Sequence, residues 1–290
     1  MLVDMDEETM ARTATSGDAA ADSLRARAAT VTRTHGPSAA VARRTAARLW
    51  GLDVLPPGTD EMTCPVDVIV GPDPDRRVHD PERVELPAAH VAERGGVRLT
   101  SPARTALDCA RWLPRAEAVA ALDQFLRRGM TVDALRTMAR TLRGYHGNDR
   151  LRAVLRAGDP GAQSPGESRT RMTLIEAGLP PPTTQIPVPG PRGDPLYIDL
   201  GYERFQVGVE YDGERHHTGR RARERDGNRC NWLRNTCGWE LIIVTKDIRR
   251  TPAPYVEAVL TALLTRGWTP TDAEMARITS RINHLHRLFR

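Results

Sequence analysis

The chain has 290 residues, of which 40% are hydrophobic and 27% charged, with a formal net charge of +5. This length suits one large or two modest globular domains, each able to bury a core. No apolar run approaches the roughly 20 residues that span a bilayer, so membrane-spanning helices are excluded from the interpretation. The charge is compatible with a nucleic-acid partner but falls short of a histone-like composition.

The cysteines and the first residues favour a reducing cytoplasm. The four cysteines form no CxxC pair, and "MLVDMDEETMARTATSGD" is acidic and polar rather than a secretory leader. Six residues separate Cys230 from Cys237, which is wider than the usual spacing of structural zinc ligands. We therefore expect free thiols and cytoplasmic localisation.

The first half reads as a mainly helical α+β domain. Residues 1–30 are expected to be a flexible lead-in, followed by a domain over 31–158. "GPSAAVARRTAARLWGL" (36–52) predicts a helix, and short β pieces follow at 64–71, 83–91 and 96–101. From Ser101 onward, apolar residues recur at three- and four-residue spacing, which predicts helices packed on a core.

A second domain is expected over 159–290, after the Gly- and Pro-rich segment 155–166. Its predicted order is helix (167–177), three strands ("TQIPVPG", "LYIDLG", "FQVGVEYDG"), an arginine-rich helix, a strand ("WELIIVT") and a terminal helix. That order is typical of the α/β class with a hairpin at its centre.

Acidic residues stand within the predicted hairpin. Glu210 and Asp212 project to one side of a strand, about 6.5–7 Å apart, and a turn at 201–204 brings Asp199 beside Glu210. Converging carboxylates repel one another, and a partly hydrated Mg²⁺ resolves that conflict. The alternative is that Asp199 and Glu210 pair with arginines across a solvated sheet face. The spacing leaves both interpretations open.

The order of helix Glu, strand Asp and next-strand Glu resembles the PD-(D/E)xK nuclease fold. The phrase "VGVEYDGERHH", with the D-x-x-R and G-W-x-hydrophobic phrases after it, is similar to very-short-patch-repair (Vsr)-like endonuclease domains. The resemblance covers about Ser164–Arg250 and implies a mixed sheet flanked by helices. It implies metal ligation by Asp199 and Glu210, with Glu167 and Gln185 completing the site. The implied chemistry is attack on a phosphodiester by a water on Mg²⁺, for which Mn²⁺ can substitute.

Two positions depart from the nuclease pattern. Ile198 stands at the nominal proline, and Asp212 stands where the motif has a lysine. The water-activating role is therefore unassigned, and Asp212 can help to hold a metal or orient His216. His216 matches a family position and can relay a proton or remain a loop histidine. Lys246, the chain's only lysine, can supply the missing charge and contact DNA, or remain solvated.

Glu167 has a second interpretation. "SPGE" is a capping box, in which Glu167 reaches back to the backbone amide of Ser164. Capping and membership of the site both remain open, since one side chain can alternate between them.

The helix after the acidic strand carries a basic face. Arg221, Arg225 and Arg229 are spaced four apart and predict contacts with DNA phosphates. A solvated face with salt bridges to Glu224 and Asp226 is the alternative. The D-x-x-R match implies that Arg229 steadies a site carboxylate or a scissile phosphate.

The first half resembles actinobacterial AbiEi-like proteins of type IV toxin–antitoxin systems, on "AARLWGL", "VRLTSPARTALDCARWL" and "ALDQFLRRG". The resemblance implies DNA binding or regulation. Arg43, Arg44 and Arg48 can contact phosphate or form a solvated helix face.

Three functions follow from these observations. The first is a Mg²⁺-dependent DNA endonuclease in repair, restriction or phage defence. The alternative is a non-catalytic, antitoxin-like DNA-binding regulator that uses a degenerate nuclease fold, and the third is a protein–protein scaffold. DNA is the expected partner, no membrane is involved, and the oligomeric state stays open.

Overall fold

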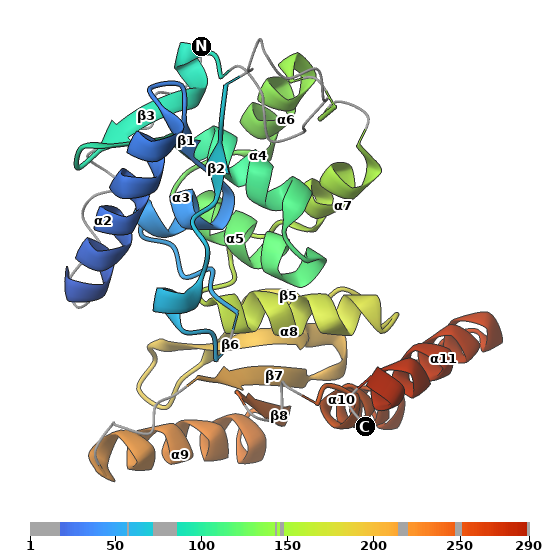
Figure 1. The fold of residues 1–290 in the computed structure, drawn as a ribbon. Coiled ribbons are helices and arrows are strands. Elements are labelled where there is room, and N and C mark those ends of the chain that lie inside the picture. The colour runs from blue at the N-terminus through green and yellow to red at the C-terminus, as the bar shows by residue number, and fades with distance from the viewer. Residues whose placement is uncertain are drawn as a thin grey trace. The chain divides into compact units, whose positions relative to one another are not determined.

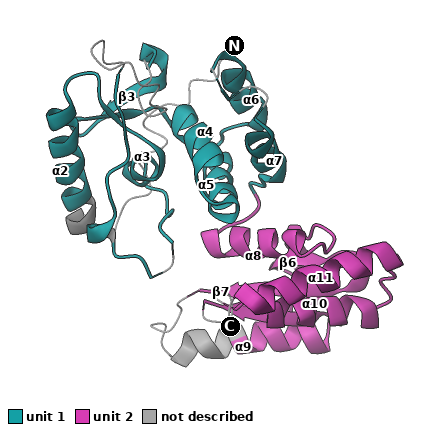
Figure 2. Ribbon diagram, turned by 45° about the vertical axis from the view of Figure 1, so that its right-hand side comes forward, with its two compact units in different colours: residues 1–160 teal, residues 161–290 magenta. Residues whose placement is uncertain are grey.

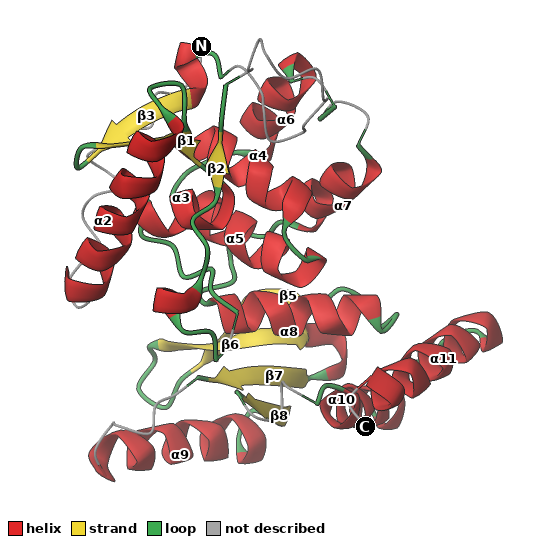
Figure 3. Cartoon of the chain, in the orientation of Figure 1, coloured by secondary structure: helices red, strands yellow, loops and turns green. Residues whose placement is uncertain are grey.

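The computed structural model describes residues 18–56, 58–71, 86–142, 144–145, 148–213, 220–246 and 251–288. The chain divides into two compact units, Met1–Pro160 and Gly161–Arg290 (Figure 2). The division falls inside the Gly- and Pro-rich segment 155–166. Both units combine helices with a four-stranded sheet, so the mixed α/β class is confirmed (Figure 3). The assignment of the second unit to the PD-(D/E)xK fold stays a prediction.

The sheet of the first unit has the strand order β2-β1-β4-β3. Its strands are β1 (Ala40–Val41), β2 (Val68–Ile69), β3 (Val91–Arg94) and β4 (Val97–Thr100). The central pair is parallel, with Val41 opposite Leu99, and the two outer pairs are antiparallel. Gly95 and Gly96 close the β3–β4 hairpin with φ of 55° and 72°, a left-handed conformation that glycine adopts without strain.

Helices make up most of the first unit (Figure 1). They are α2 (Asp18–His35), α3 (Arg43–Leu49), α4 (Pro102–Trp112), α5 (Arg115–Arg127), α6 (Val132–Thr141) and α7 (Asp149–Ala157). Two begin with a side-chain cap, since the Thr131 hydroxyl accepts from the Ala134 amide and the Asn148 side chain accepts from the Leu151 amide. The buried faces of α4 and α5 carry the apolar spacing seen in the sequence.

The first half differs from expectation at residues 18–30, at 40–41 and at Ala88–His90, which form a short 3-10 helix where a β piece was expected. Residues 18–35 form α2, with Leu24 and Ala28 buried, although residues 1–30 were expected to be a flexible lead-in. The helix expected over 36–52 is confined to α3, because residues 40–41 form β1 instead. Ala40 and Val41 are fully buried between β2 and β4, and this long-range pairing overrides their local helical pattern.

The sheet of the second unit has the order β5-β6-β7-β8. Its strands are β5 (Thr183–Pro189), β6 (Pro195–Tyr202), β7 (Val207–Asp212) and β8 (Glu240–Thr245). The first three run antiparallel and β8 lies parallel to β7. The predicted hairpin is therefore present, with a short turn at Glu203–Phe205 between β6 and β7.

Helices cover both faces of this sheet (Figure 1). They are α8 (Pro165–Glu176), α9 (Arg220–Asn235), α10 (Ala253–Thr265) and α11 (Asp272–Leu288). One core cluster joins α9 to the sheet through Leu233, Ile186, Ile198 and Leu241. The other joins the sheet to α8, α10 and α11, and includes Leu174, Leu200, Val209, Val256 and Ile278.

β6 changes its buried face at Asp199. Ile198 packs in the α9-side cluster, whereas Leu200 packs in the cluster of α8 and α10. Side chains two residues apart in a regular strand point to the same face, so the strand is irregular at this point. The β5–β6 pairing omits Gln185 and Asp199, which lie between the paired residues on their strands, and Gln185 has a φ of 49°, which is uncommon for any residue other than glycine. The irregularity coincides with the acidic residues singled out from the sequence.

Among the described residues, no helix is both long enough and apolar enough to cross a bilayer.

Candidate functional site

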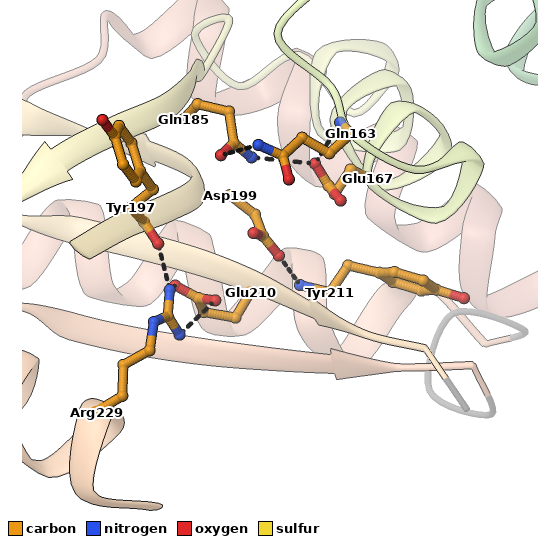
Figure 4. Close-up of polar contacts among 8 residues, drawn as sticks. All are labelled: Gln163, Glu167, Gln185, Tyr197, Asp199, Glu210, Tyr211 and Arg229. Atoms are coloured by element: carbon orange, nitrogen blue, oxygen red, sulfur yellow. Dashed lines mark hydrogen bonds and ion pairs between the residues drawn. The ribbon is translucent and has the colours of Figure 1, made fainter. Parts of the chain in front are cut away.

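Glu210 is held by Arg229. Arg229 extends from α9, and its Nη1 and Nη2 donate to the two carboxylate oxygens of Glu210 at 3.0 Å each (Figure 4). Nη2 also donates to the backbone carbonyl of Tyr197 on β6. Glu210 is only 8% exposed, so this two-point pair lies in a largely dehydrated environment. The sequence left open whether Glu210 pairs with an arginine or binds a metal ion. In the structure Glu210 pairs with Arg229.

Asp199 supports the backbone at the point where β6 and β7 separate. The last paired residues of that ladder are Leu200 and Val209. Just beyond them, one carboxylate oxygen of Asp199 accepts the Tyr211 amide at 2.9 Å. The side chain thereby satisfies a backbone donor that the strand no longer pairs.

Glu167 caps α8 and also contacts β5. Its Oε2 accepts the Gln163 amide at 2.8 Å and the Gln185 side-chain amide at 3.3 Å. The Ser164 hydroxyl accepts the Glu167 amide at 3.2 Å. The capping box is therefore reciprocal, but the returned bond goes to Gln163 and not to Ser164 as expected. These contacts confirm the capping role of Glu167, and the same carboxylate oxygen also binds the Gln185 side chain on β5. The membership of Glu167 in a metal site stays a prediction.

The negative charges of Asp199 and Glu167 affect the pKa of Glu210. Burial raises the pKa of Glu210 above the usual glutamate value, and the negative charges of Asp199 and Glu167 add to the rise. The Arg229 guanidinium opposes this rise by hydrogen bonding and by its charge. Figure 4 shows Asp199 between the Glu167 contacts on one side and the Glu210–Arg229 pair on the other. The three acids therefore lie in one neighbourhood, as the hairpin predicts for Asp199 and Glu210 and as the nuclease resemblance implies for Glu167.

The arrangement does not fit a divalent cation. Both oxygens of Glu210 are directed at a guanidinium, and one oxygen each of Asp199 and Glu167 accepts a backbone amide. Within the described part of the chain, no three His, Cys, Asp or Glu side chains are grouped so that they could hold a metal ion. The acids that the nuclease resemblance requires are present, but both oxygens of Glu210 and one oxygen each of Asp199 and Glu167 already accept hydrogen bonds.

Of the remaining residues named from the sequence, the structure describes Asp212 and Lys246, which stand at the ends of the neighbouring strands β7 and β8. Asp212 is exposed at the end of β7, paired in register with Thr245. Lys246 follows β8 and is partly exposed. His216 lies outside the described residues, as do the side chains of Arg221 and Arg225.

Sequence reasoning missed several participants. Gln163 donates its side-chain amide to the Gln185 oxygen at 2.8 Å, and Tyr197 contributes only a backbone carbonyl. The position of Gln163 immediately before the "SPGE" capping box was a usable signal, since residues there often contact the first helical turn. The carbonyl of Tyr197 carries no side-chain signal at all.

The first unit carries an exposed aromatic residue between arginines, which we call the Trp112 surface (Arg43, Arg111 and Trp112). Trp112 is 41% exposed, and the guanidinium carbons of Arg43 and Arg111 lie 4.8 and 4.9 Å from the centre of its ring system. Both distances are typical of cation–π contacts. Arg44, by contrast, forms an ion pair with Glu117. Arg43 thus joins an aromatic surface, and Arg44 is held by an acidic partner.

A buried network lies beside the Trp112 surface. Asp108, which is fully buried, accepts from Arg104 Nε at 2.9 Å and from the Tyr145 hydroxyl. Burial raises the pKa of Tyr145 to about 12, and the charge of Asp108 contributes to the rise, so the phenol remains a donor. Arg111 lies 4.4 Å from the Tyr145 ring centre. The network therefore fixes the ring against which Arg111 packs.

Comparison with known proteins identifies relatives of this chain. Residues 39–157 match the family described as the AbiEi antitoxin C-terminal domain, which confirms the AbiEi-like resemblance of the first half. Two curated Mycobacterium tuberculosis proteins, Uncharacterized protein MT2308 and Uncharacterized protein Rv2248, are each 32% identical to the chain over 210 residues. Those residues are 72% of this chain and 75% of each relative. No solved structure matches the chain. The chain belongs to the family of these mycobacterial proteins, and its first unit contains a segment that matches the AbiEi antitoxin C-terminal domain.

Proposed function

We propose that this protein is a DNA-binding regulator of the antitoxin kind, acting in a toxin–antitoxin or abortive-infection system without hydrolysing DNA. The observation that carries the proposal is the match of residues 39–157 to the AbiEi antitoxin C-terminal domain. That match covers most of the described first unit, from β1 to α7.

The Trp112 surface supports DNA as the partner. Arg43 and Arg111 provide planar guanidinium groups suited to phosphate oxygens, and the exposed part of Trp112 offers an apolar edge beside them. Phosphate contacts of this kind supply most sequence-independent affinity for DNA. The formal net charge of +5 also favours binding to the negatively charged DNA backbone.

The Glu210–Arg229 pair supports the non-catalytic half of the proposal. A hydrolytic metal needs free carboxylate oxygens, whereas both oxygens of Glu210 accept from Arg229. The lysine of the nuclease motif is also replaced by the exposed Asp212. The acid cluster is thus better suited to holding strands β6 and β7 than to activating water.

The test measures DNA binding by fluorescence anisotropy over a range of salt concentrations. Duplex DNA from upstream of the protein's own gene is compared with scrambled duplex of equal length. We expect tighter binding to the upstream DNA, and Arg43→Ala and Arg111→Ala to weaken binding to both duplexes and reduce the salt slope by about one each. Arg136→Ala is the matched control, because Arg136 is an exposed arginine of the same unit that pairs with Asp133. Absence of salt-dependent binding would contradict the proposal and favour a scaffold.

A metal-dependent endonuclease is the second candidate. The observation that favours it is the electrostatic coupling of Glu210 with Asp199 and Glu167, since such convergence of acids is what a metal site requires. Incubating supercoiled and linear DNA with Mg²⁺ or Mn²⁺, against EDTA, tests it directly. Cleavage that is lost in Asp199→Asn and in Glu210→Gln would replace the regulator with the enzyme.

A further inference from the structure

We propose that the Arg229 guanidinium is the built-in cation of the acid cluster, occupying the carboxylate oxygens that a divalent metal would need. The native protein then takes up no divalent metal at this cluster, and removal of the guanidinium creates a metal site. This inference rests on the non-catalytic half of the proposed function and on none of its DNA contacts.

The first step is the geometry of the guanidinium. It donates twice to Glu210 on β7 and once to the Tyr197 carbonyl on β6. One planar group therefore bridges the two strands next to the point where their ladder ends. A metal ion placed to bind Glu210 would have to displace this two-point pair.

The second step is the balance of charge. Glu167 and Glu210 are 6% and 8% exposed, and Asp199 is partly buried beside them. Buried carboxylates in one neighbourhood need a nearby cation or must take up protons. Arg229 supplies a positive charge in direct contact with Glu210, so its removal leaves negative charge there that a hard divalent ion can neutralise.

The third step is that α9 holds Arg229 in place. Leu233, one helical turn further on, is fully buried in the α9-side core. The indole nitrogen of Trp232 donates to the Pro189 carbonyl at 2.9 Å, which ties the same stretch of helix to β5. The packing of α9 on the sheet therefore holds Arg229 next to Glu210.

The experiment titrates Mn²⁺ into the full-length protein by isothermal calorimetry, with the fold of each variant checked by circular dichroism. We expect Arg229→Ala and Arg229→Gln to bind Mn²⁺ at least about tenfold more tightly than the native protein, with one site per chain. Adding Glu210→Gln to either variant should abolish the gain. Arg234→Ala is the matched control, because Arg234 lies on the same helix but donates to the Leu241 carbonyl instead of an acid. It should leave Mn²⁺ binding as weak as in the native protein.

Two results would overturn the inference. One is Mn²⁺ binding by the native protein that disappears in Asp199→Asn or Glu210→Gln. The other is a folded Arg229 variant with no gain in binding. Should neither Arg229 variant fold, the native titration decides by itself, since a carboxylate-dependent site contradicts the inference and its absence supports it. Native Mn²⁺ binding would leave the DNA-binding proposal standing, whereas loss of DNA affinity would leave this inference intact.

Discussion

The ring of Tyr211 lies against the backbone of Gly166. A β-carbon built on Gly166 would stand 1.9 Å from Cε1 of that ring, far inside any allowed contact. Gly166 precedes Glu167 in α8, and Tyr211 follows Glu210 in β7. The close approach of helix and strand therefore fixes the spacing between two elements that supply acids to the cluster.

Gly166→Ala should destabilise the protein, although alanine is the better helix former. Relief of the clash requires movement of the Tyr211 ring or of α8, and overpacking of this kind costs about 1–3 kcal/mol. Helix propensity alone would favour alanine by about 1 kcal/mol. Urea denaturation measures the net loss. Gly227→Ala in α9 is the control, because its β-carbon would meet nothing within 4 Å, and it should stabilise the protein or leave it unchanged.

Asp199 should tolerate loss of its charge better than loss of its oxygens. Asp199→Asn keeps an oxygen that accepts the Tyr211 amide, whereas Asp199→Ala leaves that part-buried donor unpaired at a cost of about 1–3 kcal/mol. Chemical denaturation of both variants gives the comparison. Equal destabilisation by the two substitutions would show that charge, not backbone support, is what the position provides.

Arg229→Ala should lose stability in a pH-dependent way. Burial already raises the pKa of Glu210 and Arg229 opposes the rise, so the variant should raise it further. An acid whose folded pKa lies above its unfolded pKa costs stability as pH rises through the interval between the two values. The deficit relative to the native protein should therefore be smallest at the acidic end of the pH range and increase with pH, by up to about 1.4 kcal/mol per pH unit, until the folded pKa of Glu210 in the variant is passed. Denaturation at a series of pH values checks this, and a deficit that shrinks with rising pH would contradict it.

The Asp108 network should be among the most sensitive parts of the first unit. Asp108→Asn leaves the buried Arg104 guanidinium without its countercharge, and breaking a buried ion pair in this way costs about 3–5 kcal/mol. Tyr145→Phe removes the hydrogen bond that the hydroxyl donates to Asp108 and the one that it accepts from Arg104 Nη2, and should cost about 1–3 kcal/mol. Thermal or urea unfolding ranks the two, and near-neutral behaviour of both would mean that the network contributes little to the fold.

Tyr145→Phe has a second, more specific expectation. It keeps the aromatic ring over which Arg111 lies, so DNA affinity should stay near the native value. Tyr145→Ala removes the ring and should weaken DNA binding to a degree similar to Arg111→Ala. Fluorescence anisotropy measures the DNA affinity of both folded variants. An equal loss of DNA affinity in Tyr145→Phe and Tyr145→Ala would show that binding depends on the hydroxyl and not on the ring.

Local sequence patterns are sufficient to predict the strands of the β6–β7 hairpin and the start of α8 in the second unit. Alternation along 207–211 placed Val207 and Val209 in the core and Glu210 on the other face, and the short turn before them made the β6–β7 hairpin. The "SPGE" phrase placed the start of α8. These features follow from side-chain periodicity and capping, which act over a few residues. The AbiEi-like resemblance was likewise visible in short phrases spread along the first half.

The partner of each acid depends on contacts between elements that are distant in the sequence. Arg229 follows Glu210 by 19 residues in the sequence. Its position depends on how α9 packs on the sheet through Leu233. The left-handed Gln185 and the conversion of residues 40–41 to a strand also depend on neighbours far away in sequence. Periodicity shows which face a side chain occupies, but the choice between an arginine and a metal rests on a contact between two elements. That contact is made by packing, which no local pattern encodes.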